Sequence, residues 1–415
     1  MAHLLLLDAP GGNDFTILED AVRLGHEVTF FTSDLAPYRR QGAAALQSIA
    51  LAREVVEIPG FDYAEFERAA LSIHGARPFG AILCLIDIRL VESSRLAEKL
   101  GLRFLNTASC VLLRDKFRVR EALARHGISQ PAFALANGPG DLVEAVRRVG
   151  YPTLVKPCDG YGSQDVALLE SVADLEAMVA SLHAQSGKPT HYGLGVFANN
   201  RLSVERFVRG DLIGCDVFVA GTGKLFLGVN DKRMYAPPSF AIRGSCFPTK
   251  RHDLCAIHSY ASRILDAVGF DYGAAHIEMI LAEGGPYLVE VNARLVSAQI
   301  PYQMGYAFGR SLYADLIDLH LGRPLEDLKG PDEYSYCAIR WLVADREGAL
   351  AAIRWPEAAG DWIRRVVQFK QPGDAVRPPR NNGDRIAYVM ATGASQPEAE
   401  GRAEEYLAAT RLELQ

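Results

Sequence analysis

Short apolar runs alternate with amphipathic helical patterns in the first quarter of the chain. Strand patterns lie at residues 3–8, 27–31 and 81–86, and helical patterns lie at residues 15–24 and 89–100. Strands that alternate with helices are typical of a parallel sheet with crossover helices. The pattern therefore predicts an open α/β domain over residues 1–110.

The pattern changes farther along the chain, where strands follow one another through short glycine turns. Residues 212–220 and 224–229 flank Gly221-Thr222-Gly223, and residues 274–282 and 287–292 flank Glu283-Gly284-Gly285. Such pairs predict two β-hairpins, with an amphipathic helix at 254–268 between them. Residues 184–200 carry no period and are expected to form a loop. Strands are expected at 336–343 and 385–390, and a last helix at 397–412.

Composition narrows the class of protein. The 415 residues include 44 Lys+Arg and 50 Asp+Glu, a net charge of −6, which argues against general nucleic-acid binding. No apolar run reaches the length of a membrane helix, and Asp8 interrupts the N-terminal leucines, so neither a membrane span nor a signal peptide is expected. The seven cysteines are scattered, without a Cys-x-x-Cys pair. These features favour a reduced cytoplasmic protein with buried thiols, without a disulfide framework or zinc site.

The second hairpin carries the most informative chemistry. If its loop has three residues, Glu283 to Gly285, then Glu278 faces Glu290. Alternation places Asn292 on the same face, together with Arg294 if the strand continues. Carboxylate and amide oxygens that converge in this way suit Mg²⁺. A four-residue loop would separate the two glutamates, and a solvated surface hairpin is the alternative. Glu290 lies in an apolar strand, however, where an unpaired charge is costly.

A second candidate site follows the predicted strand at 153–156. Lys156 ends this strand, and the glycine-containing loop after it can cradle a polyphosphate with its backbone N–H groups. An ordinary turn with an exposed lysine is the alternative. The stretches 204–211 and 114–116 are weaker candidates, since a half-buried strand with a turn and a solvated first helical turn explain them better when each is taken alone. No Gly-x-Gly-x-x-Gly, Walker A or Gly-x-Ser-x-Gly motif is present.

Together, these four elements resemble the ATP-grasp superfamily in their order and spacing. More narrowly, the chain is similar to the carboxylate–amine ligases that include the bacterial L-amino acid ligases. The resemblance covers nearly the whole chain and implies an α/β (α+β) ATP-grasp fold. It implies a preface domain at 1–110, a linker helix and lid at 111–203, an ATP-grasp core at 204–328, and a C-terminal subdomain at 329–415 that packs on the core.

The resemblance assigns nucleotide-binding roles. Lys116 and Lys156 would contact the phosphates of ATP. Glu205 would accept a hydrogen bond from the adenine amino group, and Asp211 would hold the ribose hydroxyls. The remaining nucleotide-binding positions are the lid-loop residues Gly160, Gly162 and Ser163, together with Phe207 and the Val208 backbone.

The resemblance also assigns the catalytic end of the site. Glu278, Glu290 and Asn292 would bind two Mg²⁺ ions, for which Mn²⁺ could substitute. Arg294 would touch the γ-phosphate and the acyl intermediate, and Lys232 would lie near the reacting atoms. Many relatives read Asn-Pro-Arg-x-Gly-Gly where this chain has Asn292-Ala293-Arg294-Leu295-Val296-Ser297, which leaves the substrates open.

The implied reaction joins a carboxylate to an amine through an acyl phosphate, with release of ADP and phosphate. Two small molecules, amino acids among them, are the expected substrates, and the family suggests a homodimer. Neither a nucleic acid nor a membrane is an expected partner. γ-Glutamyl-type ligation, ligation of a non-amino-acid carboxylate, a non-catalytic ATP-binding protein and an NAD-dependent enzyme are the alternatives. The last lacks the glycine fingerprint that a dinucleotide site needs.

Overall fold

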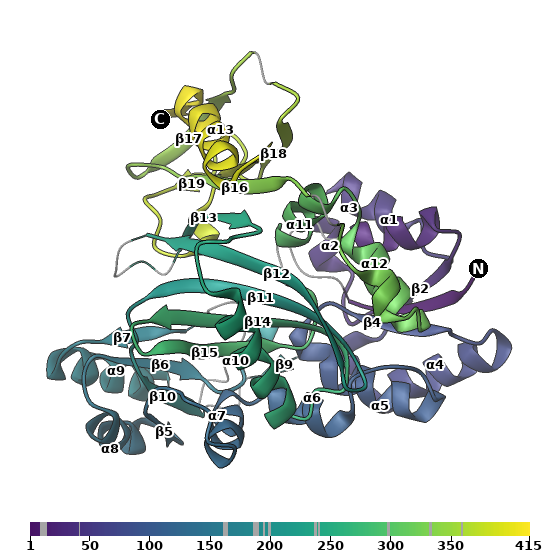
Figure 1. The fold of residues 1–415 in the computed structure, drawn as a ribbon, viewed down its shortest axis with the longest axis horizontal. Coiled ribbons are helices and arrows are strands. Elements are labelled where there is room, and N and C mark those ends of the chain that lie inside the picture. The colour runs from purple at the N-terminus through teal and green to yellow at the C-terminus, as the bar shows by residue number, and fades with distance from the viewer. Residues whose placement is uncertain are drawn as a thin grey trace.

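The computed structural model describes the chain except for residues 9–14, 41, 161–164, 186–190, 194–195, 198–200, 236–238, 240, 297–298, 332–333 and 358–359. Figure 1 shows a large central sheet with the N-terminal domain at one side, a small sheet below it and the C-terminal elements above. These parts are built from different strand patterns, and the small sheet and the large sheet both line one cavity.

The N-terminal sheet is parallel, as the alternation of strands and helices predicted. Its order is β3 (Glu54–Glu57), β2 (Glu27–Thr32), β1 (His3–Leu7), β4 (Ala81–Cys84). Leu4 and Leu6 pack in one core with α1 (Thr16–Arg23), whereas Leu5 and Leu7 pack in another with α4 (Tyr63–Ala76) and α5 (Leu90–Leu100). A strand buried on both faces needs an unbroken apolar run, which explains the four leucines.

The sequence pattern missed several elements between the second and third predicted strands. These are β3, α2 (Ala36–Arg40), α3 (Ala43–Ile49) and α4. Only two of the four residues of β3 are apolar, and the strand lies at the edge of the sheet. An exposed edge strand leaves little hydrophobic signal, because one side of it contacts no neighbouring strand.

A small antiparallel sheet follows helices α6 (Thr107–Leu113) and α7 (Lys116–Arg125). Its order is β5 (Phe133–Ala136), β10 (Leu202–Arg206), β6 (Thr153–Pro157), β7 (Ala167–Leu169), and it carries α8 (Pro139–Val149) and α9 (Val172–Gln185). The expectation that residues 184–200 form a loop was wrong in part. Two short strands, β8 (His191–Gly193) and β9 (Val196–Phe197), pair there.

The large sheet contains both predicted hairpins and also the strands near the C-terminus. Its order is β15 (Gly285–Asn292), β14 (Tyr272–Ala282), β11 (Asp211–Ala220), β12 (Gly223–Met234), β13 (Ile242–Phe247), β16 (Tyr336–Leu342), β20 (Ala387–Gly393), β18 (Ile363–Gln368). Strands β17 (Gly348–Arg354), β19 (Ala375–Val376) and β21 (Arg411–Leu414) form a separate small sheet. The C-terminal strands therefore extend the same sheet that carries the candidate site.

Helices cover the two faces of the large sheet. Helix α10 (Leu254–Ala267) packs in one core with β11, β14 and α7. Helices α11 (Ile300–Phe308) and α12 (Leu312–Leu321) pack on the opposite face together with α1, and α13 (Gln396–Ala409) covers the C-terminal strands. Six of the seven cysteines are buried as expected, whereas Cys255 is exposed. No helix among the described residues is long and apolar enough to cross a lipid bilayer.

Candidate active site

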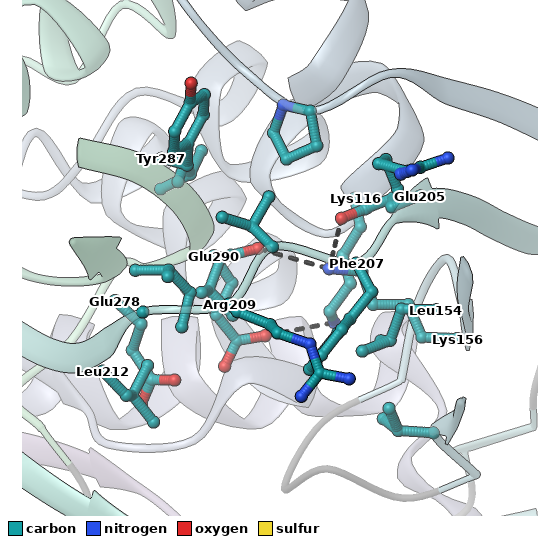
Figure 2. Close-up of a pocket in the computed structure, with 18 of the residues that line it drawn as sticks. Lys116, Leu154, Lys156, Glu205, Phe207, Arg209, Leu212, Glu278, Tyr287 and Glu290 are labelled. Carbon is teal, nitrogen blue, oxygen red and sulfur yellow. Dashed lines mark hydrogen bonds and ion pairs between the residues drawn. The ribbon is translucent and has the colours of Figure 1, made fainter. Parts of the chain in front are cut away.

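A cavity of about 390 Å³ opens between the small sheet and the large sheet. Such a volume lies in the usual range of small-molecule sites. Its walls come from β6 and β10 on one side and from β11, β14 and β15 on the other (Figure 2). One group of lining residues is apolar: Pro131, Leu154, Val166, Phe207, Val208, Leu212, Met234, Ile280 and Leu288. Another group is charged: Lys116, Arg120, Lys156, Glu205, Glu278 and Glu290. The cavity can therefore hold a ligand with a flat apolar part and an anionic part.

Glu278 and Glu290 face each other across β14 and β15, as the sequence predicted, but for a different reason. The strands are joined by a two-residue turn, with Ala282 opposite Gly285, and not by the predicted three-residue loop. With a regular ladder this turn would place Glu278 opposite Val289. A β-bulge between Glu278 and Met279 in the pairing restores the match with Glu290. Bulges re-aim side chains in this way next to functional sites.

Val289, the extra residue of this bulge, lines the cavity, and its carbonyl oxygen accepts two hydrogen bonds there. Nζ of Lys156 donates to the Val289 oxygen at 3.3 Å, and the Arg120 guanidinium donates to it at the same distance. Both cations approach Oε2 of Glu205 on β10, Lys156 at 3.0 Å and Arg120 at 2.7 Å. These contacts tie β6, β10, α7 and β15 together at the back of the cavity.

The Glu205 carboxylate is buried and fully engaged. Its Oε1 accepts from the Ser203 hydroxyl at 2.8 Å, in addition to the two cations on Oε2. Burial alone would raise the pKa of Glu205, but the charges of Arg120 and Lys156 outweigh it and hold the pKa at about 2. Burial in turn lowers the pKa of Lys156. Glu205, which is predicted to accept a hydrogen bond from the adenine amino group, therefore also holds Arg120 and Lys156 in place.

Lys116 opens α7 at the boundary between the two sheets. Asp115 caps this helix by accepting from the N–H groups of Phe117 and Arg118, which fixes the direction of the first turn. The Lys116 Nζ lies 3.5 Å from Oε2 of Glu290 and donates to the Gly160 carbonyl. The two predicted motifs around 114–116 and 158–163 therefore meet through these contacts.

The end of β15 brings Asn292 and Arg294 next to Glu290, as predicted. The Asn292 amide donates to Oε1 of Glu290 at 3.3 Å, and the Arg294 guanidinium donates to Oδ1 of Asn292 at 3.2 Å. Sequence reasoning missed the main partner of Arg294, which is Asp87 from the N-terminal domain. Arg294 donates to Oδ2 of Asp87 from NH2 at 2.6 Å and from Nε at 2.9 Å.

A buried polar chain leads to Glu278 from the middle of the large sheet. Lys232 donates to Oε1 of Glu278, and its Nζ lies 3.1 Å from Nε2 of His276. The other ring nitrogen of His276 lies 2.9 Å from Oδ1 of Asp216. Burial alone would lower the pKa of His276, but Asp216 outweighs this effect and raises it. Burial would raise the pKa of Glu278, but Lys232 and His276 hold it well below its ordinary value. Glu278 is therefore ionised.

The position of His276 two residues before Glu278 was the available signal for this chain. Residues i and i+2 of a strand share a face, so His276 had to lie beside Glu278. Asp231, which precedes Lys232, faces the other side of β12. Its carboxylate accepts from the Cys246 N–H at 2.6 Å and from Gln396 at 2.8 Å. Only Lys232 of this pair reaches the candidate site.

The other predicted nucleotide-binding residues divide into three groups. Gly160, Phe207 and Val208 line the cavity, and Phe207 is labelled in Figure 2. Asp211 is exposed at the start of β11 and does not line it, although its neighbours Gly210 and Leu212 do. Gly162 and Ser163 lie outside the described residues.

The side-chain atoms that could act as ligands determine which metal ion suits the site. Glu278, Glu290 and Asn292 offer hard oxygen atoms, and Lys232 and Lys116 now neutralise the two carboxylates. Among the described residues, no three or more His, Cys, Asp and Glu side chains converge to hold a metal ion on their own. Two carboxylates and an amide match Mg²⁺ that takes its remaining oxygens from phosphate groups and water.

Two family models match parts of the chain. Residues 149–301 match the family model of an ATP-grasp domain, and residues 340–415 match the L-amino acid ligase C-terminal domain 2. The chain is 26% identical over 294 residues to an uncharacterized protein of Sinorhizobium fredii, across 69% of this chain and 58% of that protein. It is 27% identical over 360 residues to carnosine synthase 1 of Gallus gallus, across 82% of this chain and 38% of that protein.

The fold is also found among solved structures. The crystal structure of an L-amino acid ligase from Bacillus licheniformis superposes with a TM-score of 0.79 at 20% identity, covering 100% of this chain and 99% of that one. The chain spans well under two thirds of the length of the two sequence relatives named above. The two family matches therefore identify an ATP-grasp domain at residues 149–301 and an L-amino acid ligase C-terminal domain 2 at residues 340–415, and the fold as a whole is that of the solved ligase.

Proposed function

We propose that the protein is an ATP-dependent carboxylate–amine ligase that joins two small molecules, amino acids among them, through an acyl phosphate. The observation that carries this proposal is the opposition of Glu278 and Glu290, flanked by Lys116, Lys232 and Arg294, at the cavity. A carboxylate and an amine do not condense in water unless the carboxylate is first activated. The family matches and the relatives named above support this reaction class.

The cavity supports one orientation of the nucleotide. Its apolar residues, Leu154, Phe207 and Leu288 among them, suit the adenine ring, and the exposed Asp211 is close enough in sequence to this wall to serve the ribose. Within the described residues no acceptor is found for the Val208 N–H, which makes it available to a ring nitrogen. Lys116, Lys156, Gly160, Gly162 and Ser163 would then meet the phosphates.

The ionised carboxylates would hold Mg²⁺ at the phosphates. Glu278, Glu290 and Asn292 are the proposed ligands of two ions, which Mn²⁺ could replace. Bound Mg²⁺ would neutralise phosphate charge and act as a Lewis acid. Lys232 and Lys116 pair with the same carboxylates in this structure. Both lysines are therefore also positioned to contact the phosphate oxygens when the nucleotide binds.

Side chains of this protein would assist the remaining steps of the reaction. The substrate carboxylate attacks the γ-phosphate, which brings anions together, and Arg294 and Lys232 would lower the barrier by stabilising the developing charge. An acyl phosphate and ADP result. The amine nitrogen then attacks the acyl carbon, a proton leaves that nitrogen, and phosphate departs. Arg294 would stabilise the tetrahedral oxyanion, and closure of the small sheet over the cavity would exclude water that hydrolyses the acyl phosphate.

The test is ADP release with Mg-ATP against single amino acids, paired amino acids and simple carboxylates, with products weighed by mass spectrometry. We expect turnover that needs one carboxylate and one amine, and that stops with a chelator. Lys116→Ala should abolish it, whereas Arg118→Ala should not, because Arg118 is 56% exposed two residues farther along the same helix. Nucleotide binding without turnover across the whole panel would contradict the proposal and favour an ATP-binding role. The four-part domain division, the homodimer and the cytoplasmic location stay predictions.

A further inference from the structure

Arg294 meets a carboxylate that lies 207 positions earlier in the chain. Both Nε and NH2 donate to Oδ2 of Asp87, and the side chains of Arg294 and Asp87 are each 10% exposed. Nε and NH2 sit on one edge of the guanidinium, so this contact fixes the plane of the group as well as its position. We propose that Asp87 is a positioning residue that aims Arg294 at the reacting carboxylate, an inference that rests on the ligase function proposed above.

The topology of the N-terminal sheet explains why Asp87 lies there. Strand β1 pairs with β2 on one side and with β4 on the other, so the strand order reverses between β1 and β4. The carboxyl ends of strands at such a reversal border a crevice that commonly binds ligands. Asp8 follows β1, and Asp87 lies just after β4 in the short helix η2 (Asp87–Arg89).

At this reversal of strand order, a buried ion pair between Asp8 and Arg89 holds η2. Arg89 donates from Nε to Oδ2 of Asp8 at 2.9 Å, and its guanidinium lies 3.6 Å from the centre of the Phe61 ring. Oδ1 of Asp8 accepts from the hydroxyls of Thr32 at 2.6 Å and Tyr38 at 3.1 Å. Asp8 and Arg89 are both buried, and a buried pair with these added hydrogen bonds holds its elements in one geometry.

The Asp8–Arg89 pair therefore anchors the short helix that begins at Asp87, and Asp87 in turn contacts Arg294. Arg294 follows the end of β15, where no strand ladder restrains it. Among the described residues, the Arg294 guanidinium otherwise donates hydrogen bonds to Oδ1 of Asn292 and to the Leu295 carbonyl. Without Asp87 the guanidinium would keep its charge but lose the partner that fixes two of its nitrogens, and pre-organisation of the charge would be lost.

The first test is a double-mutant cycle on Asp87 and Arg294. Asp87→Asn, which keeps the size of the side chain, should lower kcat by about 10- to 100-fold, as is usual when a partner of a working group is removed. The KM for ATP should stay near its wild-type value, since Asp87 does not line the nucleotide cavity. In an Arg294→Lys background the same substitution should cost little, because the guanidinium that Asp87 orients is gone. Equal losses in the two backgrounds would overturn the proposal.

A matched control separates positioning from stability. Asp20→Asn removes another carboxylate of the N-terminal domain that pairs with an arginine, Arg23 at 2.9 Å. It should leave kcat unchanged, and thermal unfolding of both variants shows whether the domain stays folded. If Asp20→Asn lowers kcat as much as Asp87→Asn does, the effect is one of domain stability and the positioning role is wrong.

A second measurement does not depend on turnover. An arginine-selective dicarbonyl reagent followed by peptide mass mapping reports the modification rate of Arg294 directly. We expect faster labelling of Arg294 in Asp87→Asn than in the wild type. Arg402 of the C-terminal helix α13, which pairs with Glu398 at 2.7 Å, should be unchanged and serves as an internal standard. Unchanged labelling of Arg294 would overturn the positioning role. A wild type without turnover would overturn the ligase function alone, because the labelling result stands by itself.

Discussion

Glu278 and Glu290 lie directly opposite each other on β14 and β15, and a bulge at Val289 produces this match across a two-residue turn. Each carboxylate has its own cation, Lys232 for Glu278 and Lys116 for Glu290. These two lysines come from β12 and from the start of α7. The two carboxylates are therefore neutralised in the absence of ligand, which makes two neighbouring half-buried carboxylates tolerable.

Removal of one of these carboxylates should abolish the chemistry and leave the fold intact. We expect Glu290→Gln to lower Mg²⁺-dependent ADP release by about 100- to 1,000-fold, because a proposed ligand of the Mg²⁺ that would neutralise the transferred phosphoryl group is lost. The measurement is a coupled assay for ADP at saturating ATP. Glu283→Gln is the control, since Glu283 is exposed in the turn of the same hairpin. Turnover close to the wild type in Glu290→Gln would exclude this hairpin as the metal site.

Gly214 leaves room for the His276 ring beside Glu278. A Cβ added at Gly214 would lie 2.4 Å from Cε1 of His276 and 3.0 Å from the side-chain amide of Asn230. We expect Gly214→Ala to reduce the free energy of unfolding by about 1–3 kcal/mol, because both buried neighbours must move. Urea unfolding measures the change.

The same substitution in an open position should have the opposite sign. Gly401 lies inside α13, and a Cβ there would meet no atom within 4 Å. Gly401→Ala should stabilise the protein by up to about 1 kcal/mol through helix propensity. If both variants shift the unfolding midpoint in the same direction, crowding around His276 is not the cause.

His320 predicts a dependence of stability on pH. Burial lowers its pKa from 6.5 to about 4. Between about pH 6.5 and pH 4, His320 is protonated in the unfolded chain but stays neutral in the folded protein. Protonation therefore favours unfolding in this pH range. The contribution of His320 is complete above pH 6.5 and is lost as the pH falls towards 4.

The matching variant is His320→Asn, whose amide can replace the ring Nδ1 that contacts the Arg103 carbonyl at 3.3 Å. We expect the difference in unfolding free energy between wild type and variant to shrink from pH 7 to pH 4. Urea unfolding at several pH values follows it. A difference that stays constant over this range would show that His320 titrates normally.

Glu400 should tie the C-terminal helix to the strand that carries Lys232. Its carboxylate lies 2.8 Å from Arg251 and 3.0 Å from the Gln396 amide, pairs with Arg233 of β12, and is 7% exposed. We expect Glu400→Ala to cost about 3–5 kcal/mol, because it leaves arginines without their buried partner.

Glu404→Ala provides the comparison within the same cluster. Glu404 lies one turn farther along α13, contacts Arg340 at 2.9 Å and is 53% exposed. Its removal should cost about 1 kcal/mol or less, because solvent screens the pair. Equal losses in the two variants would mean that burial does not distinguish these two carboxylates.

The local features of this structure could be predicted from the sequence alone. The alternation of apolar runs and helices predicted the parallel N-terminal sheet, and the two glycine turns predicted the hairpins. Strand alternation placed Glu290 and Asn292 on one face, whereas the match of Glu278 with Glu290 also required the bulge at Val289. Such features depend on residues a few positions apart, where periodicity is a direct consequence of backbone geometry.

Other features of the structure could not be predicted from the pattern of apolar and polar residues. The loop between β14 and β15 was predicted one residue too long, since a bulge inserts a residue without changing the apolar pattern that defines the strands. The edge strand β3 and the pairing of the C-terminal strands with the core sheet were not expected either. Strand neighbours are chosen by the packing of whole elements, which no local period records.

The contacts that finish the site belong to this second class. Asp87 reaches Arg294 from another sheet, Arg120 and Lys156 converge on Glu205 from a helix and a strand, and Asp216 reaches His276 across β11 and β14. Sequence determined which side chains share a face. Only the tertiary structure decided which faces meet, because long-range contacts are set by how complete elements bury their apolar surfaces against one another.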